Sequence, residues 1–486
     1  MESAAMPPRG VAAPWTPSSL HQALRCNHLL LHRTKDATNP RRISCCKATG
    51  RGARVDRRDV LLGLGGAAAA AGLATSHGGG GALASPIQAP DLETCHAPDL
   101  VPETASGVSC CLAYRPATAI VDFQPPPAQV TVQAPIDKPC ACRFYLYFHE
   151  RILGKLIGDG TFALPFWNWD APGGMTLPVI YTNESSPLYD EMRNPDPQPQ
   201  FALDLDYSSN DSTIIPRDVQ INQNLMIMYR QMISGAKKKE LFFGQPYRQG
   251  DAPDPGAGTI ENLPHGPIHA WLGDPRQPNG EDMGNFYSAG RDPVFLAHHG
   301  NIDRLWHVWS GLHPGNDTGF TDADWLDAAF LFYDEDARPV RARVRDCLDA
   351  AALRYAYQDV ALPWLNAKPA TEAGSPAAPA TDALPATLSQ TVRVAVARPR
   401  MSRSRGEKEG EEEVAVVDGI VVADHTRFVK FDVFVNASSQ VGAAAECAGS
   451  VVLTPHAGRP GKGKGAMRTA ARFGICDLLD DIISAL

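Results

Sequence analysis

The sequence has no excess of positive charge and no strongly apolar run long enough to span a membrane. Its 45 lysine and arginine residues are outnumbered by 54 aspartate and glutamate residues, which gives a net charge of −9. Nucleic-acid-binding proteins need a basic surface, so this balance argues against DNA or RNA as a partner. The glycine-rich run after Asp59 offers roughly eighteen weakly apolar residues, which makes a poor bilayer span. We expect no nucleic-acid partner and no integral membrane segment in the mature chain.

Acidic residues are scarce in the first 84 positions, where four stand against eleven lysine and arginine residues. An acid-poor N-terminus that contains arginine and serine is typical of an organelle transit peptide. Arg57-Arg58 then precedes the glycine-rich run, and Ala82-Leu83-Ala84 follows it, as in a twin-arginine export signal with its cleavage site. We predict that residues 1–84 are a bipartite signal for the chloroplast and then the thylakoid lumen, in preference to a short membrane anchor.

The cysteines are unevenly distributed. Of the eleven, three lie in the predicted signal and five lie between positions 95 and 142. Such crowding favours disulfide bonds in an oxidising compartment, and the spacing leaves their connectivity open. Cys140 and Cys142 could together hold a soft metal, but a disulfide or free thiols are the favoured interpretation.

Residues 85 to about 140 are rich in proline and have no period, which suits an arm wrapped over a core. From Arg143 the apolar residues take a helical period, and we expect residues 85–315 to form a mainly α domain. The length of 486 residues and the 44% hydrophobic content fit two or three globular domains. The aromatic run at 162–170 is expected to be buried. Apolar residues at spacings of three and four predict helices from Arg143 to Gly158, around 218–233, from Leu263 and across 295–309.

After position 315 the pattern changes. We expect a connector at 316–365, a linker rich in Ala, Pro and Thr at 366–390, and a β domain at 391–486. The charged run Arg405 to Glu413 is interpreted as an exposed hairpin tip. A clean alternation at Thr391–Val396 predicts a strand. Runs rich in Val and Phe predict two more, at Val414–Val422 and Phe428–Val435.

Three histidines form a candidate metal site. His265 and His269 are four residues apart, so on a helix their imidazoles project from one face and can share an ion. Imidazole is the usual protein ligand of copper and zinc, and a third ligand is offered by the downstream pair His298-His299. A zinc hydrolase would place a glutamate directly after the first histidine, but Gly266 stands there.

These segments resemble plant polyphenol oxidase (catechol oxidase or tyrosinase class), a type-3 dicopper enzyme. The resemblance rests on residues 145–170, on 261–274 (ENLPHGPIHAWLGD) and on 280–309, and it extends to Asp324-Trp325-Leu326 and Lys430-Phe431-Asp432-Val433. It implies an α copper-binding core built on a four-helix bundle, which would be incomplete here. A small β-sandwich-like domain that shields the copper site would follow at the C-terminus.

The resemblance also assigns roles to individual residues. It makes His265, His269 and His299 the ligands of the family's second copper, with His298 as a close neighbour. Asp303 would orient a ligating imidazole. Glu261 matches a carboxylate that holds a water near the site, Phe286 a gate over the coppers, and Gly266 a position that tunes activity on monophenols.

The first copper site of the family has no counterpart in this sequence. Its third histidine aligns with Cys142, and the segment that carries the other two is missing. His96 and His149 are the only histidines between Ser85 and Ile260, and we expect neither to be a ligand. The resemblance implies copper as the cofactor. The family holds two copper ions, and we expect at most one in this chain because the ligands of the first are missing. A genuine deletion and a wrongly joined exon both stay open, and the abrupt in-frame loss favours the second.

The family activity is the oxidation of o-diphenols to o-quinones with O2 reduced to water. Small phenols and O2 are thus the expected partners. The alternatives are a catalytically impaired copper-binding remnant and a mononuclear copper protein with a different, weak redox activity. The copper content of each chain separates these hypotheses, because the family reaction needs two ions. The sequence leaves the natural phenol and the oligomeric state open.

Overall fold

The computed structural model describes most of the chain after Ala141 and short stretches before it. The described residues are 25–26, 88, 119–126, 141–196, 201–208, 215–246, 248, 254–277, 279–314, 320–370, 379–400, 402–437, 446–455 and 466–485. The four cysteines between positions 95 and 140 and nearly all of the predicted signal lie outside them. Within the described part, no helix is both long enough and apolar enough to cross a bilayer.

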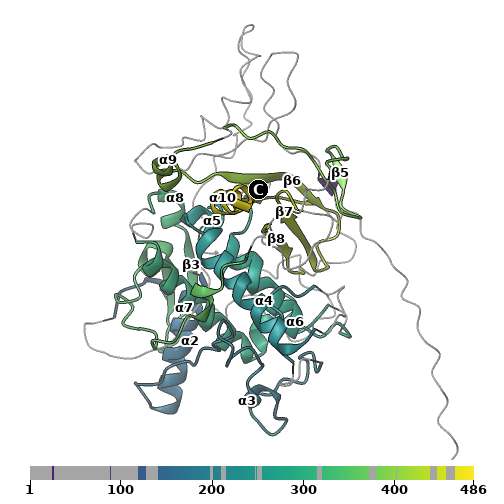
Figure 1. The fold of residues 1–486 in the computed structure, drawn as a ribbon. Coiled ribbons are helices and arrows are strands. Elements are labelled where there is room, and N and C mark those ends of the chain that lie inside the picture. Colours follow the sequence, from purple (N-terminus) through teal and green to yellow (C-terminus); the bar gives the residue numbers. More distant parts are fainter. Residues whose placement is uncertain are drawn as a thin grey trace, which may run out of the picture.

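Helices build the first part of the fold, as the periodicity predicted (Figure 1). The long helices α2, α4 and α7 follow the predicted segments closely, and a π-helical turn at Arg230–Ser234 extends α4. The helices of this part are α2 (Ala141–Ile157), α3 (Val179–Thr182), α4 (Arg217–Tyr229), α5 (Lys239–Phe242), α6 (Gly266–Leu272) and α7 (Val294–Leu312).

Helix α2 ends at Gly158, where φ is +72°, a conformation that favours glycine. The amide of Asp159 donates to the carbonyl of Gly154 at 2.9 Å and so satisfies one of the last helical carbonyls. The aromatic run that follows α2 is buried in part: Trp167 is 3% exposed and Trp169 is fully buried, whereas Phe162 and Phe166 are partly exposed.

Buried ion pairs fix α7 at its start and near its middle. Asp292 accepts from the amide of Val294 at 2.9 Å at the start of the helix, and its carboxylate also binds Arg193. One turn past the histidines, Arg304 lies 2.5 Å from Asp170, and the indole of Trp364 donates to the same carboxylate at 2.9 Å. Buried charges that are paired in this way hold α7 in one position in the core.

Small sheets follow the helices. Strands β3 (Ala329–Tyr333) and β4 (Pro339–Arg343) form a hairpin, to which β2 (Val121–Asp122) adds in parallel. The same part of the chain contains three short helical turns, α8 (Ala323–Leu326), η5 (Val344–Cys347) and η6 (Pro363–Asn366). We refer to the described part of the chain from residue 386 onward as the C-terminal region.

The C-terminal region contains two sheets that share a core. Strand β6 (Val414–Val422) pairs with β9 (Met467–Gly474), and β7 (Val429–Phe434) pairs with β8 (Cys447–Leu453), all antiparallel. Side chains from all four strands pack in one cluster that includes Ile420, Val451 and Phe473. Strand β1 (Arg25–Cys26) pairs with the other side of β6, and β5 (Ala386–Thr387) pairs with β1 at the edge of this sheet. Helix α10 (Cys476–Ala485) ends the region.

Two sequence predictions in this region are wrong. Residues 391–396 form no strand, because the backbone of Arg393 exchanges hydrogen bonds with Asp382 across a loop instead of with a neighbouring strand. The charged run at 405–413 begins as helix α9 (Arg405–Gly410) and forms no hairpin tip. The side chain of Ser404 accepts from the amide of Glu407, and the Glu407 carboxylate accepts in return from the Ser404 amide, so a capping box starts the helix.

Candidate copper site

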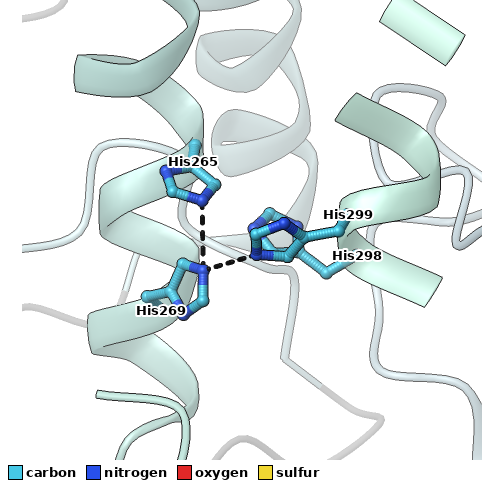
Figure 2. A group of neighbouring side chains, drawn as sticks. All are labelled: His265, His269, His298 and His299. Atoms are coloured by element: carbon cyan, nitrogen blue, oxygen red, sulfur yellow. Dashed lines mark hydrogen bonds between the residues drawn. The ribbon is translucent and has the colours of Figure 1, made fainter. Parts of the chain in front are cut away.

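The candidate site lies between α6 and α7 (Figure 2). A π-helical turn at Glu261–His265 leads directly into α6, with Leu263 in an extended conformation, so the regular helix starts at Gly266 and not at Leu263. His265 and His269 therefore stand one turn apart on the same face. His298 and His299 approach them from α7, and all four imidazoles are at least 95% buried.

Three imidazole nitrogens converge on one point. Nε2 of His269 lies 3.1 Å from Nε2 of His265 and 2.9 Å from Nε2 of His299. A tetrahedral ion with metal–nitrogen bonds of about 2.0–2.1 Å separates its ligand nitrogens by roughly 3.3 Å, close to these distances. The donor set, three buried imidazoles, therefore fits a copper or zinc ion.

Neighbouring groups hold two of these rings. Nδ1 of His269 lies 2.8 Å from the carbonyl oxygen of Met283, which can accept only if Nδ1 carries the proton. This contact leaves the Nε2 lone pair for a metal. The ring of Phe295 stacks on His299 with a centroid distance of 3.8 Å, and as it lies one turn earlier on α7 it fixes the plane of that imidazole. The periodicity of 295–309 placed Phe295 on α7 but gave no sign of this contact.

Asp303 lies one turn past His299, and it is fully buried. Its carboxylate accepts from Nε of Arg143 at 2.7 Å and from the hydroxyls of Tyr355 and Tyr357. Burial raises the pKa of Asp303, and Arg143 opposes this shift. These contacts tie α7 to α2 and to the segment after η5. Two of the partners, Tyr355 and Tyr357, follow a stretch of sequence with no helical or strand period, which left them unnoticed.

The C-terminal region covers the residues around the histidines. A Cβ atom added to Gly266 would lie 2.6 Å from a methyl carbon of Val452 in β8, so only glycine fits without a shift. The amide of Val452 donates to the side chain of Asn262 at 2.9 Å. Farther from the site, Lys430 in β7 lies 2.9 Å from Asp206 of the helical part.

The remaining predicted residues lie around this cluster. Glu261 is partly buried at the start of the π-helical turn, and Phe286 is 50% exposed in the loop between α6 and α7. Cys142 is in the first turn of α2. His149, later on α2, stacks on Tyr145 with a centroid distance of 6.1 Å and is not part of the cluster. Among the described residues, the metal-capable group comprises His265, His269, His298 and His299.

Three of the described cysteines, Cys347, Cys447 and Cys476, are free thiols. The predicted disulfides concern the cysteines between positions 95 and 142. Those residues lie outside the described part or, at Cys142, have a side chain whose placement is not described.

The helical core and its buried histidines define a tyrosinase-type copper protein. Residues 143–312 match the common central domain of tyrosinase. Residues 319–370 match the polyphenol oxidase middle domain, and residues 384–484 match the chloroplastic polyphenol oxidase C-terminal domain.

Similarity to individual proteins identifies the family more closely. The chain is 42% identical to a chloroplastic polyphenol oxidase of Malus domestica, over 91% of this chain and 88% of the relative. It is also 42% identical to aureusidin synthase of Antirrhinum majus, over 82% and 84% of the two chains. The structure of latent apple tyrosinase superposes with a TM-score of 0.65 at 49% identity, over 71% of this chain and 76% of that one. The chain belongs to the plant polyphenol oxidase family.

Proposed function

We propose that the chain holds one copper ion on His265, His269 and His299 and is impaired in the two-electron oxidation of o-diphenols. The observation that carries this proposal is the single metal-capable group found among the described residues, which these histidines form together with His298. Its convergent nitrogens and its burial suit a copper ion, and the contact from His269 to the Met283 carbonyl favours the tautomer that a metal requires.

The stoichiometry of the family reaction explains why one ion is insufficient. An o-diphenol gives up two electrons and two protons to become an o-quinone, and two such oxidations reduce one O2 to two waters. Each bound copper ion would change its oxidation state by one electron. A pair of ions can therefore take the two electrons of one phenol together, whereas one ion cannot.

Two observations support the loss of the first copper site. His149 on α2 lies outside the histidine cluster. The alignment with the Malus domestica enzyme extends over 533 positions although 91% of the 486 residues of this chain take part, so about 90 aligned positions have no residue here. This total is large enough to include a helix of the copper-binding bundle together with its histidines.

Full polyphenol oxidase activity is the second candidate. The 42% identity to a named polyphenol oxidase over most of both chains favours it. Its substrates would be small phenols and O2. Identity to aureusidin synthase leaves the particular phenol open.

The residues around the histidine cluster would act on the substrate and on the bound ion. Phe286 would form a gate over the metal site, Glu261 would hold a water beside the ion, and Gly266 would tune activity on monophenols. Asp303 would position the helix that carries His299. The C-terminal region would shield the ion, since Val452 packs against Gly266.

We also propose a cellular location and domain boundaries for the chain. A signal at 1–84 would direct the protein to the chloroplast, as the names of its relatives support, and then to the thylakoid lumen. The copper domain would span 85–315 and the C-terminal domain 391–486, with a connector and a linker between them.

Copper content and oxygen uptake test the proposal together. The full chain, stripped by a chelator and reloaded with Cu(II), should hold one copper ion and show no catechol-dependent oxygen uptake above that of free copper. His269→Gln should abolish the binding, whereas His307→Gln, on the exposed side of α7, should leave it unchanged. Two coppers per chain with sustained oxygen uptake would establish the second candidate instead.

A further inference from the structure

We propose that His298 is the fourth ligand of the metal ion in this chain and closes the coordination sphere with a fourth imidazole. The inference rests on the proposed one-copper site and deepens it. It revises the expectation that His298 is only a neighbour of the ligands.

The position of His298 among the other rings carries the inference. Its ring centroid lies 5.4 Å from that of His265, 5.1 Å from His269 and 5.1 Å from His299. The three expected ligands are separated from one another by 4.6, 5.0 and 5.1 Å. His298 is therefore nearly as close to each ligand as the ligands are to one another.

The chain geometry brings two successive residues to one ion. Neighbouring residues of a helix usually project about 100° apart, so only one of two adjacent histidines is expected to face a given partner. Here α6 approaches α7 where both rings can reach it, and Figure 2 shows His298 and His299 side by side, facing His265 and His269. One ligand nitrogen from each of the four residues lies within 4.8 Å of the other three.

A modest shift completes a tetrahedral site. Ligand nitrogens around a tetrahedral ion are roughly 3.3 Å apart, so the widest separation closes by about 1.5 Å. Small rotations shared by four imidazoles can supply this movement. His298 is fully buried, and its ring lies 5.8 Å from that of Trp169, which limits how far it can turn away from the cluster.

Closure of the sphere has a chemical consequence. Metal sites with four protein ligands are typically structural, while catalytic sites keep one position open for water or substrate. A four-imidazole ion would have no position left for a phenol or for O2. It would instead stabilise the fold by joining α6 to α7, and Cu(II) should bind more tightly than Zn(II).

The test counts the nitrogens on the metal in the full chain. Co(II) loaded into the wild type should give the intense visible bands of a tetrahedral ion, and Cu(II) electron paramagnetic resonance should show coupling to four imidazole nitrogens. Three nitrogens with a solvent ligand would overturn the inference and leave the one-copper proposal standing. Failure to bind any metal would overturn both.

Variants add a second readout. Loss of a group that only supports a ligand costs about 10–100-fold in metal affinity, so a true ligand should cost more. We expect His298→Gln to bind Co(II) more than about 100-fold more weakly and to show coupling to three imidazole nitrogens in place of four in the Cu(II) spectrum, with His307→Gln as the control on the same helix. A His298→Gln protein whose Cu(II) spectrum shows the same number of coupled imidazole nitrogens as the wild type would refute the fourth ligand. Because the spectra of the wild type need no variant, a folding defect in His298→Gln leaves the test intact.

Discussion

Replacement of Asp303 by asparagine should destabilise the protein more than any loss of a surface charge. Asp303 is fully buried and pairs with Arg143, which is 2% exposed and has no other carboxylate at contact distance among the described residues. The asparagine keeps the size of the side chain but removes its charge. The buried guanidinium would then have no counter-charge in a medium where hydration cannot replace it.

The magnitude follows from the contacts that remain. Breaking one partner of a buried ion pair costs about 3–5 kcal/mol. Arg143 would retain its hydrogen bond to the Cys347 carbonyl at 2.7 Å and its position 3.6 Å above the ring of Trp306, which moderate the loss. The hydroxyls of Tyr355 and Tyr357 would compete for the one carbonyl oxygen of the asparagine, and this competition increases the loss of stability. We expect a decrease of about 3–5 kcal/mol in the free energy of unfolding.

Urea denaturation followed by circular dichroism measures this change. Asp336→Asn is the matched control, because Asp336 pairs with Lys155 at 2.7 Å but both side chains are more than half exposed. It should cost at most about 1 kcal/mol. In the double variant Arg143→Met with Asp303→Leu, stability should recover toward the wild type, since no buried charge remains. An Asp303→Asn loss as small as that of Asp336→Asn would refute the reasoning.

Three further predictions concern groups away from the histidines. Burial raises the pKa of Glu150 from its ordinary 4.5 to about 8, so the folded chain keeps a proton that the unfolded chain releases. Stability should therefore fall as pH rises from about 4.5 to 8, and Glu150→Gln should flatten this dependence in urea titrations over that range. Burial also raises the pKa of the Cys476 thiol to about 11. Its iodoacetamide labelling in the folded protein, followed by peptide mass spectrometry, should be at least about 100-fold slower than in urea, and equal rates would contradict the burial. Asn262→Ala leaves the amide of Val452 without its acceptor and should cost about 1–3 kcal/mol in unfolding free energy, whereas an unchanged value would exclude this contact as a tie between the two parts of the chain.

The sequence predicted those elements whose cause is local. The spacing of apolar residues in 218–233 and 295–309 depends only on neighbours three and four positions away, and α4 and α7 follow it. The capping box of Ser404 and Glu407 is also a local pattern, and it was overlooked because the charges around it suggested an exposed turn. The alternation at 391–396 looked like a strand, but a strand needs a partner, and Arg393 is paired with Asp382 instead.

The candidate site could be predicted only in part, because its surroundings come from distant segments. The spacing of His265 and His269 implied a shared face, and the structure brings both next to His299. The positions of Phe295 and His298 depend on the approach of α6 to α7. The contact between Gly266 and Val452 joins residues 186 positions apart, and no pattern around either residue indicates the other.

The contacts between the C-terminal region and the helical part also determine the effect of proteolytic cleavage between them. Val452 binds Asn262, and Lys430 and Asp477 reach Asp206 and Lys237 of the helical part, so these contacts would survive cleavage anywhere between residues 370 and 386. While the chain is intact, the covalent link keeps the covering region at an effective concentration in the millimolar range. After cleavage, that region would behave as a separate subunit with its own dissociation constant. Access to the metal site would then depend on how far the protein is diluted.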